Sequence, residues 1–329
     1  MSKVLDIRDL TIHFETSDGI VRAVNGLTLS MDKGETLGVV GETGAGKTTL
    51  AKAIMRLHRN QSQAVKSGKI YYNGQDLLEL SEPEMRNVRG KQISMIFQDP
   101  MTSLNPVITV ELQIAEVVEA HQKVSREEAV KLARDMLDLV GIPRNRGGEY
   151  PHQFSGGMKQ RVVIAIAMAC NPDLLLADEP TTALDVTIQA QVLDMIRSLR
   201  DKNGTSIMLI THDLGVVAQN CDHVAIVYAG EVVEHGDVRQ IFKNTSHPYT
   251  IGLLGSVPKL TENVHRLQPI NGLMPDPTAL PIGCFFCTRC RYADEHCRQN
   301  HPDIVEIEPG HSVRCFHARI SRKEGRHDE

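Results

Sequence analysis

The chain has 329 residues, of which 41% are hydrophobic and 23% charged, enough for one large buried core and a smaller one. Its net charge is −5, only 4% of its residues are aromatic, and tryptophan is absent. Broad contact with nucleic acid requires a basic surface and aromatic side chains on which bases stack, so this composition argues against a nucleic-acid partner.

A membrane-spanning segment is not expected either. The longest apolar run that we find covers residues 162–170, whereas a helix that crosses a membrane needs roughly 18 apolar residues. The N-terminal residues alternate like a strand and hold no apolar signal core. We therefore expect a soluble, cytoplasmic protein that reaches a membrane only through partners.

Strands and helices are predicted to alternate along most of the chain. Short apolar or alternating runs predict strands within 4–31 and at 36–40, 69–72, 76–78, 93–97, 174–177, 206–210, 224–228 and 231–234. Helical spacing of apolar residues predicts helices at 48–58, 107–141, 155–169 and 186–201. This order predicts an α/β fold with a mostly parallel sheet, and the N-terminal and late hairpins predict an antiparallel annex.

The composition changes near residue 255, where a stretch with several prolines begins. Prolines at this density predict a linker. We therefore divide the chain into a large domain, residues 1–255, and a C-terminal extension, residues 256–329, which holds five of the seven cysteines.

A glycine-rich loop follows the predicted strand 36–40 and opens a helix. It fits the phosphate-loop pattern at every fixed position, so its N–H groups and the helix N-terminus would hold phosphates of ATP. Lys47 would reach the β- and γ-phosphates, and the Thr48 hydroxyl would bind Mg²⁺. A glycine-rich turn without function is the alternative. The predicted nucleotide-binding residues are Gly41, Glu42, Thr43, Gly44, Ala45, Gly46, Lys47, Thr48 and Thr49.

Polar side chains follow three other predicted strands. Asp178 and Glu179 end the apolar run 174–177, and we expect Asp178 to contact Mg²⁺ and Glu179 to polarise the attacking water. Solvated acids at a strand end are the alternative. His212 follows the strand 206–210 and suits the γ-phosphate, although a single histidine there is often without function. Gln98 follows the strand 93–97, and its amide suits Mg²⁺ or the attacking water.

A second predicted anion site lies at the start of a helix, where Ser155, Gly156 and Gly157 offer a hydroxyl and free N–H groups. One chain has no reason to hold two phosphate sites so far apart in sequence. The second site would therefore meet the ATP of another copy, and an ordinary helix cap is the equal alternative.

In this order the motifs resemble those of the ATP-binding cassette (ABC) ATPases, over about residues 3–250. The motifs are the phosphate loop, Gln98, Phe154–Met158, Leu174–Glu179, Ala183–Asp185 and His212. The family signature usually reads Leu-Ser-Gly-Gly-Gln, from which Phe154 and Met158 depart at its two ends. The resemblance implies that Phe14 stacks on adenine, and that two nucleotide domains clamp ATP between the Ser155 loop of one and the phosphate loop of the other.

Four longer runs narrow the resemblance to the ATPases of dipeptide, oligopeptide and nickel importers: 97–106, 150–153, 178–187 and 247–250. It implies a P-loop NTPase core with an inserted helical subdomain near residues 100–165. It also implies a second ATPase subunit, identical or different, under two membrane permease subunits at the cytoplasmic face of the membrane, with a separate solute-binding protein. Peptides are the expected solute. Nickel, metal chelates and oligosaccharides stay open, and an exporter or a soluble ABC ATPase of repair or translation is the less favoured alternative.

The clustered cysteines predict a metal site, because disulfides are rare in a reducing cytoplasm. The spacing of Cys284, Cys287 and Cys290 resembles the start of a ferredoxin run, which Cys297 or Cys315 would complete. The importer resemblance implies another set, Cys284, Cys290, Cys297 and Cys315, as ligands of a [4Fe-4S] cluster, with Cys287 outside it. Zinc is the alternative metal, since four thiolates suit it equally, and unmetallated thiols are the third possibility.

Overall fold

The computed structural model describes residues 2–58, 64–181, 184–256 and 270–318. The chain forms two compact units. The first unit comprises Met1–Val4, Asp32–Glu35 and Leu77–Ile210, and the second comprises Leu5–Met31, Thr36–Asp76 and Thr211–Glu329. Along the sequence, much of the second unit therefore comes first, most of the first unit follows, and the rest of the second unit comes last.

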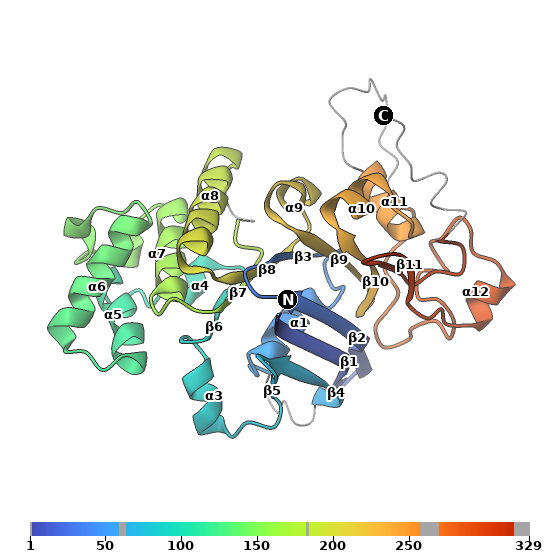
Figure 1. Ribbon diagram of the computed structural model, residues 1–329, viewed down its shortest axis with the longest axis horizontal. Coiled ribbons are helices and arrows are strands. Elements are labelled where there is room, and N and C mark those ends of the chain that lie inside the picture. The colour runs from blue at the N-terminus through green and yellow to red at the C-terminus, as the bar shows by residue number, and fades with distance from the viewer. Residues whose placement is uncertain (1, 59–63, 182–183, 257–269, 319–329) are drawn as a thin grey trace. The chain divides into compact units, whose positions relative to one another are not determined.

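The predicted antiparallel annex is confirmed as a sheet with the order β2-β1-β4-β5 (Figure 1). Its strands are β1 (Lys3–Thr16), β2 (Gly19–Asp32), β4 (Val65–Tyr72) and β5 (Gln75–Asp76). β1 pairs antiparallel with β4, so that Ile7 faces Ile70. Asn73 and Gly74, with φ angles of 47° and 85°, turn the chain from β4 into β5, the two-residue turn that such a pair of residues favours.

The second unit also contributes five strands of the main sheet, in the order β3-β9-β10-β12-β11. These strands are β3 (Thr36–Val40), β9 (His223–Tyr228), β10 (Glu231–Asp237), β11 (Val305–Glu308) and β12 (His311–Val313). β3 and β9 are parallel, and the other pairs are antiparallel. The prediction that the late hairpin, β9 and β10, joins the annex is therefore wrong, because β9 pairs with β3 instead.

Short helices complete the second unit. They are α1 (Lys47–Ile54), α9 (Leu214–Asn220), α10 (Val238–Lys243), α11 (Pro248–Gly255) and α12 (Glu295–Gln299). Tyr228 of β9, Tyr249 of α11 and Phe286 of the extension pack in one buried cluster, with ring centroids 4.7–5.5 Å apart. The extension thus shares a hydrophobic core with the strands and helices that precede it.

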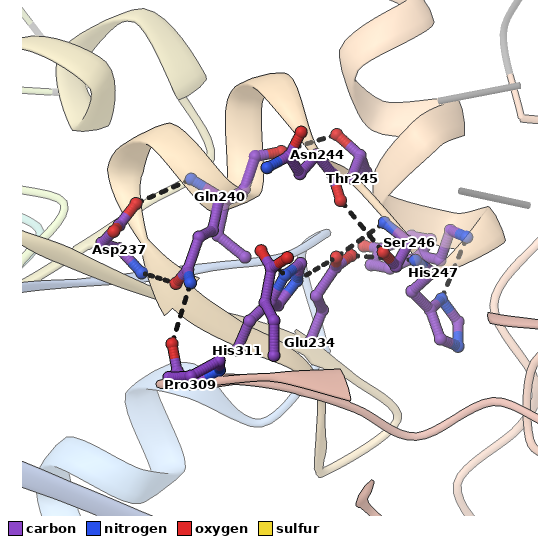
Figure 2. Close-up of polar contacts among 12 residues, drawn as sticks. Glu234, Asp237, Gln240, Asn244, Thr245, Ser246, His247, Pro309 and His311 are labelled. Atoms are coloured by element: carbon purple, nitrogen blue, oxygen red, sulfur yellow. Dashed lines mark hydrogen bonds and ion pairs between the residues drawn. The ribbon is translucent and has the colours of Figure 1, made fainter. Parts of the chain in front are cut away.

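A buried carboxylate joins the extension to β10. The side chains of Glu234 and His311 are both fully buried, and the His311 Nε2–Glu234 Oε1 distance is 2.9 Å. The same carboxylate accepts hydrogen bonds from the N–H groups of Ser246 (2.7 Å) and His247 (3.0 Å), as Figure 2 shows. Glu308 accepts from the other ring nitrogen of His311 at 3.2 Å. Hydrogen bonds that fully satisfy a buried charge make its location specific.

The first unit holds the parallel strands β6 (Ile93–Ile96), β7 (Leu174–Asp178) and β8 (Ser206–Thr211), side by side in that order. Its helices are α3 (Glu82–Val88), α4 (Pro100–Ser103), α5 (Val110–His121), α6 (Arg126–Leu139), α7 (Gly156–Met168) and α8 (Val186–Asn203), with single 3-10 turns at Arg144–Arg146 and Pro151–Gln153. Every residue of β7 is buried, as expected of a parallel strand covered on both faces.

The helical stretch predicted at 107–141 is two helices rather than one. The break comes where Ser125 caps α6 by accepting a hydrogen bond from the N–H of Glu128. α6 buries Ala133 and Leu137 and leaves Leu132 and Leu139 exposed. No helix in the described ranges is long and apolar enough to cross a membrane.

Candidate active site

The phosphate loop joins the buried strand β3 to helix α1 in the second unit. Gly44 and Gly46 have φ angles of 86° and 100°, which side-chain-bearing residues rarely adopt. A Cβ on Gly46 would collide with the carbonyl oxygen of Ala23, and one on Gly41 with that of Val227. Glycine is therefore required at Gly44 and Gly46 by the backbone angles of the loop. It is required at Gly41 and Gly46 because neighbouring strands leave no space for a side chain.

Lys47 lies over this loop and is almost fully buried. Its Nζ donates hydrogen bonds to the carbonyl oxygens of Gly41 at 2.7 Å and Glu42 at 3.0 Å. These bonds hold the ammonium group across the mouth of the loop, where a bound phosphate would take it as a charge partner.

Behind the loop, the tip of the β9–β10 hairpin fixes its backbone. The Gly230 N–H donates to the Ala45 carbonyl at 2.9 Å, and the Gly230 carbonyl accepts from the Asn25 N–H at 2.9 Å. Asn25 Nδ2 also donates to the Ala229 carbonyl at 2.8 Å. The annex and the main sheet therefore both support the loop.

Phe14 contacts the segment that follows α1. Its ring meets His58 edge-on with centroids 5.1 Å apart, and His58 Nε2 is hydrogen-bonded to the Thr49 carbonyl at 2.9 Å. Phe14 and the partly buried Thr48 thus belong to the same unit as the phosphate loop. Their contacts with adenine and Mg²⁺ stay predictions.

Two residues that we did not predict hold Glu42. Arg289 donates from Nη1 and Nη2 to the two carboxylate oxygens of Glu42, at 3.0 and 3.1 Å, and the Glu42 N–H donates to the Tyr249 hydroxyl at 3.0 Å. Burial raises the pKa of Tyr249 well above its usual value, so the phenol stays neutral. Tyr249 lies within the importer-like run 247–250, and Arg289 directly precedes Cys290 of the importer-like cysteine pattern. This resemblance was the one signal in the sequence that pointed to either residue.

In the first unit, Asp178 and Glu179 follow β7 as predicted. Asp178 is almost fully buried, and the Glu179 N–H donates to the Ile210 carbonyl at 2.8 Å. Glu179 has a φ of 48°, a left-handed conformation that is strained for its residue type and typical of functional positions. Gln98 Nε2 donates to Glu179 Oε2 at 2.9 Å, so the structure brings together two of the predicted catalytic side chains.

The signature residues lie at the start of α7 in the same unit. Ser155 caps the helix by accepting a hydrogen bond from the Met158 N–H at 3.4 Å. The hollow in front of them has a volume of about 550 Å³, and its lining residues are Gly141, Ser155, Gly156, Gly157, Met158, Arg161, Leu184, Asp185 and Ile188. A Cβ on Gly157 would come within 2.7 Å of the Ile188 side chain, which explains glycine there.

The remaining predicted residue, His212, directly follows β8 and is exposed in the second unit. The predicted ATP-site residues therefore divide between the units. Gln98, Asp178, Glu179 and the Ser155 loop belong to the first, and the phosphate loop, Phe14 and His212 to the second.

All five clustered cysteines line one small cavity in the second unit. They are Cys284, Cys287, Cys290, Cys297 and Cys315, and His247, Phe286 and His317 lie at the same cavity. Burial, with a smaller contribution from the neighbouring cysteines, raises the pKa of the Cys284 and Cys315 thiols to about 12. Thiols from separate parts of the extension thus converge at one place, as a metal site requires.

The fold and the phosphate loop define a P-loop ATPase, and comparisons with known proteins narrow this class. Residues 24–182 match the family model "ABC transporter", and residues 233–297 match "Oligopeptide/dipeptide transporter, C-terminal region". A solved dimer of the ATP-binding cassette MJ0796, bound to ADP and Pi, has a TM-score of 0.65 at 26% identity and covers 71% of this chain and 99% of that chain.

Curated relatives are similar over nearly the whole length. The oligopeptide transport ATP-binding protein OppD of Bacillus subtilis is 50% identical, covering 96% of this chain and 89% of its own. The dipeptide transport ATP-binding protein DppD of the same organism is 49% identical, covering 96% and 95%. The probable peptide ABC transporter ATP-binding protein y4tR of Sinorhizobium fredii is 50% identical, covering 95% and 94%. The chain belongs to the ABC transporter family and is one of its ATP-hydrolysing subunits.

Proposed function

We propose that this chain hydrolyses ATP to drive the import of di- or oligopeptides, as a peripheral subunit at the cytoplasmic face of the cell membrane. The observation that carries the proposal is the match of residues 233–297 to the C-terminal region of oligopeptide and dipeptide transporters, beside an ABC cassette. Two relatives named for oligopeptide and dipeptide transport, both about half identical, support the same solute class.

In this function the chain pairs with a second ABC ATPase subunit and with two membrane permease subunits, and a solute-binding protein delivers the peptide. ATP binds between the phosphate loop of one ATPase subunit and the Ser155 loop of the other. Lys47 and the loop N–H groups hold the phosphates, while Thr48, Gln98 and Asp178 hold Mg²⁺. Glu179 polarises the attacking water, and His212 contacts the γ-phosphate.

The test is ATP hydrolysis by the assembled transporter in lipid vesicles, with the solute-binding protein supplied with dipeptides, oligopeptides, nickel or oligosaccharides. Peptides should stimulate hydrolysis, and Glu179→Gln should lower it roughly a hundredfold while ATP still binds. Stimulation by nickel or a sugar alone would refute the solute class. Near-normal turnover of Glu179→Gln would refute the role of Glu179.

For the cysteine cavity we propose a [4Fe-4S] cluster held by Cys284, Cys290, Cys297 and Cys315. Zinc bound by four thiolates needs sulfur atoms about 3.8 Å apart, because the Zn–S bond is about 2.3 Å and the geometry tetrahedral. Among the described residues, the one group of three potential ligand atoms within 4.8 Å of one another is Asp294, Cys297 and His317. No three of the five cysteine sulfur atoms, all within the described residues, lie within 4.8 Å of one another, and this spacing suits a cluster of several irons better than a single zinc ion.

Anaerobic purification distinguishes these metals. The iron-bound protein should be brown and contain about four irons per chain, and replacing Cys287 with serine should keep the colour while the same change at Cys290 removes it. A colourless protein with one zinc per chain would overturn the cluster. Loss of colour on Cys287→Ser would overturn the ligand set.

A further inference from the structure

An arginine of the cysteine-bearing loop is locked onto the phosphate loop. The Arg289 side chain is only 5% exposed, and its two terminal nitrogens bind both carboxylate oxygens of Glu42. Its Nε donates to the Asn271 carbonyl at 3.1 Å, and its guanidinium lies 5.8 and 6.0 Å from the ring centroids of Tyr228 and Phe286. Together, these hydrogen bonds and ring contacts hold the guanidinium in a single position.

Glu42 is an unexpected residue at its position. It is the second residue of a loop that holds a polyanion, and a free carboxylate there would repel the phosphates. Its carbonyl accepts from Lys47 Nζ, and its N–H donates to Tyr249. Glu42 therefore connects the phosphate-binding lysine, the aromatic core and Arg289.

A second part of the extension reaches the same loop. The Cε atom of Met274 lies 3.1 Å from the place where a Cβ on Gly44 would be. The Pro277 carbonyl accepts a hydrogen bond from the Arg22 N–H at 2.9 Å, which ties this segment to β2 of the annex. The contact between the extension and the phosphate loop is thus a surface and not one isolated ion pair.

We propose that Arg289 is a positioning residue of the ATP site, which neutralises Glu42 and holds the phosphate loop in its binding conformation. The proposal deepens the ATP-binding role proposed above and does not depend on which metal the cysteines hold. Arg289 directly precedes Cys290 in the sequence, and Cys284 and Cys290 pack against the core cluster that contains Phe286. We therefore expect metal binding at the cysteines to favour the observed position of Arg289 and, through it, ATP binding.

The test is a double-mutant cycle on the full chain, with ATP affinity measured by calorimetry. Arg289→Ala should raise the Kd for ATP about tenfold, since a bidentate charge pair is lost and a carboxylate is left facing the phosphates. In the Glu42→Gln background the change Arg289→Ala should raise the Kd less than it does in wild type, because no carboxylate is then left unpaired beside the phosphates, and the double variant should bind better than Arg289→Ala alone. Arg289→Lys, which keeps the charge without the two-pronged geometry, should lie between.

Arg291→Ala is the matched control, because Arg291 stacks on Tyr292 in the same segment and has no role in the proposal. AMP affinity should fall less than ATP affinity in Arg289→Ala, since the repulsion grows with phosphate charge. With Mg²⁺ present throughout, wild type purified without metal at the cysteines should bind ATP more weakly than metal-loaded wild type, and the double variant should bind ATP equally in both forms.

Unchanged ATP affinity in Arg289→Ala, or a double variant as weak as Arg289→Ala, would overturn the proposal. An equal effect of the cysteine-bound metal on ATP binding in wild type and double variant would overturn the link to the cysteines. Failure of wild type itself to bind ATP would instead refute the proposed function. Metal content measured in every variant separates loss of the arginine from loss of the cysteine site.

Discussion

Replacing Glu234 with alanine should detach the C-terminal strands from β10. The change removes a fully buried carboxylate that accepts from His311 and from the Ser246 and His247 N–H groups. Each buried donor left without a partner costs about 1–3 kcal/mol, and breaking a buried ion pair costs about 3–5 kcal/mol in total. We therefore expect the opening free energy of β12 to fall by about 3–5 kcal/mol.

Hydrogen exchange measured by mass spectrometry is the suitable assay, because it reports local opening and the chain has no tryptophan for fluorescence. Amides of residues 305–313 should exchange at least about a hundredfold faster in Glu234→Ala, since 1.4 kcal/mol is a factor of ten. Glu308→Gln is the matched control. It alters the more exposed carboxylate on the other side of His311, at 3.2 Å, and should change exchange less than about tenfold.

The pH dependence gives a second readout of the same contact. Burial lowers the pKa of His311, but the hydrogen bonds and charges of Glu234 and Glu308 outweigh it, and the net shift is upward. A raised pKa in the folded state stabilises the contact below pH about 6.5, and this stabilisation is lost as the pH rises through the folded value. Opening of β12, corrected for intrinsic exchange, should increase with pH in wild type and not in Glu234→Ala. Equal protection in both proteins at every pH would refute the reasoning.

Three further predictions concern the ATP site and the core. Lys47→Ala should weaken ATP binding about tenfold or more in calorimetry, because a charge contact to phosphate is lost, and unchanged affinity would contradict the phosphate-loop assignment. Gly46→Val should lower nucleotide binding and the melting temperature together, since its side chain would collide with the Ala23 carbonyl, and a normal melting temperature would contradict that packing. His247, whose pKa burial lowers to about 3, should make the protein less stable as the pH falls below 6.5, by about 2 kcal/mol at pH 5, and His247→Gln should flatten this slope in thermal melts.

The sequence predicted the elements whose signals are local. A glycine-rich loop between a strand and a helix and a buried strand that ends in Asp178 are each specified within a few neighbouring residues, and both are found where expected. The break between α5 and α6 was missed because apolar residues at helical spacing lie on both sides of it, although Ser125 marks the cap.

Long-range pairings left no comparable signal. Arg289 and Glu42 are 247 residues apart, and Glu234 and His311 are 77 apart, so no periodicity or spacing connects them. β11 and β12 have four and three residues, too few for an alternating pattern to stand out. The hairpin pattern of β9 and β10 indicated their pairing with each other, but could not indicate which sheet they join.

The contact between β10 and β12 joins strands that are synthesised at different times. When β10 leaves the ribosome, one of its edges has no partner, because His311 is made 77 residues later. At about 5–20 residues per second this edge is open for several seconds. Ser246 and His247 are made 12 and 13 residues after Glu234, so their N–H groups are available to its carboxylate during most of that time. The acceptor that later receives His311 can therefore be in place before the C-terminal strands are synthesised.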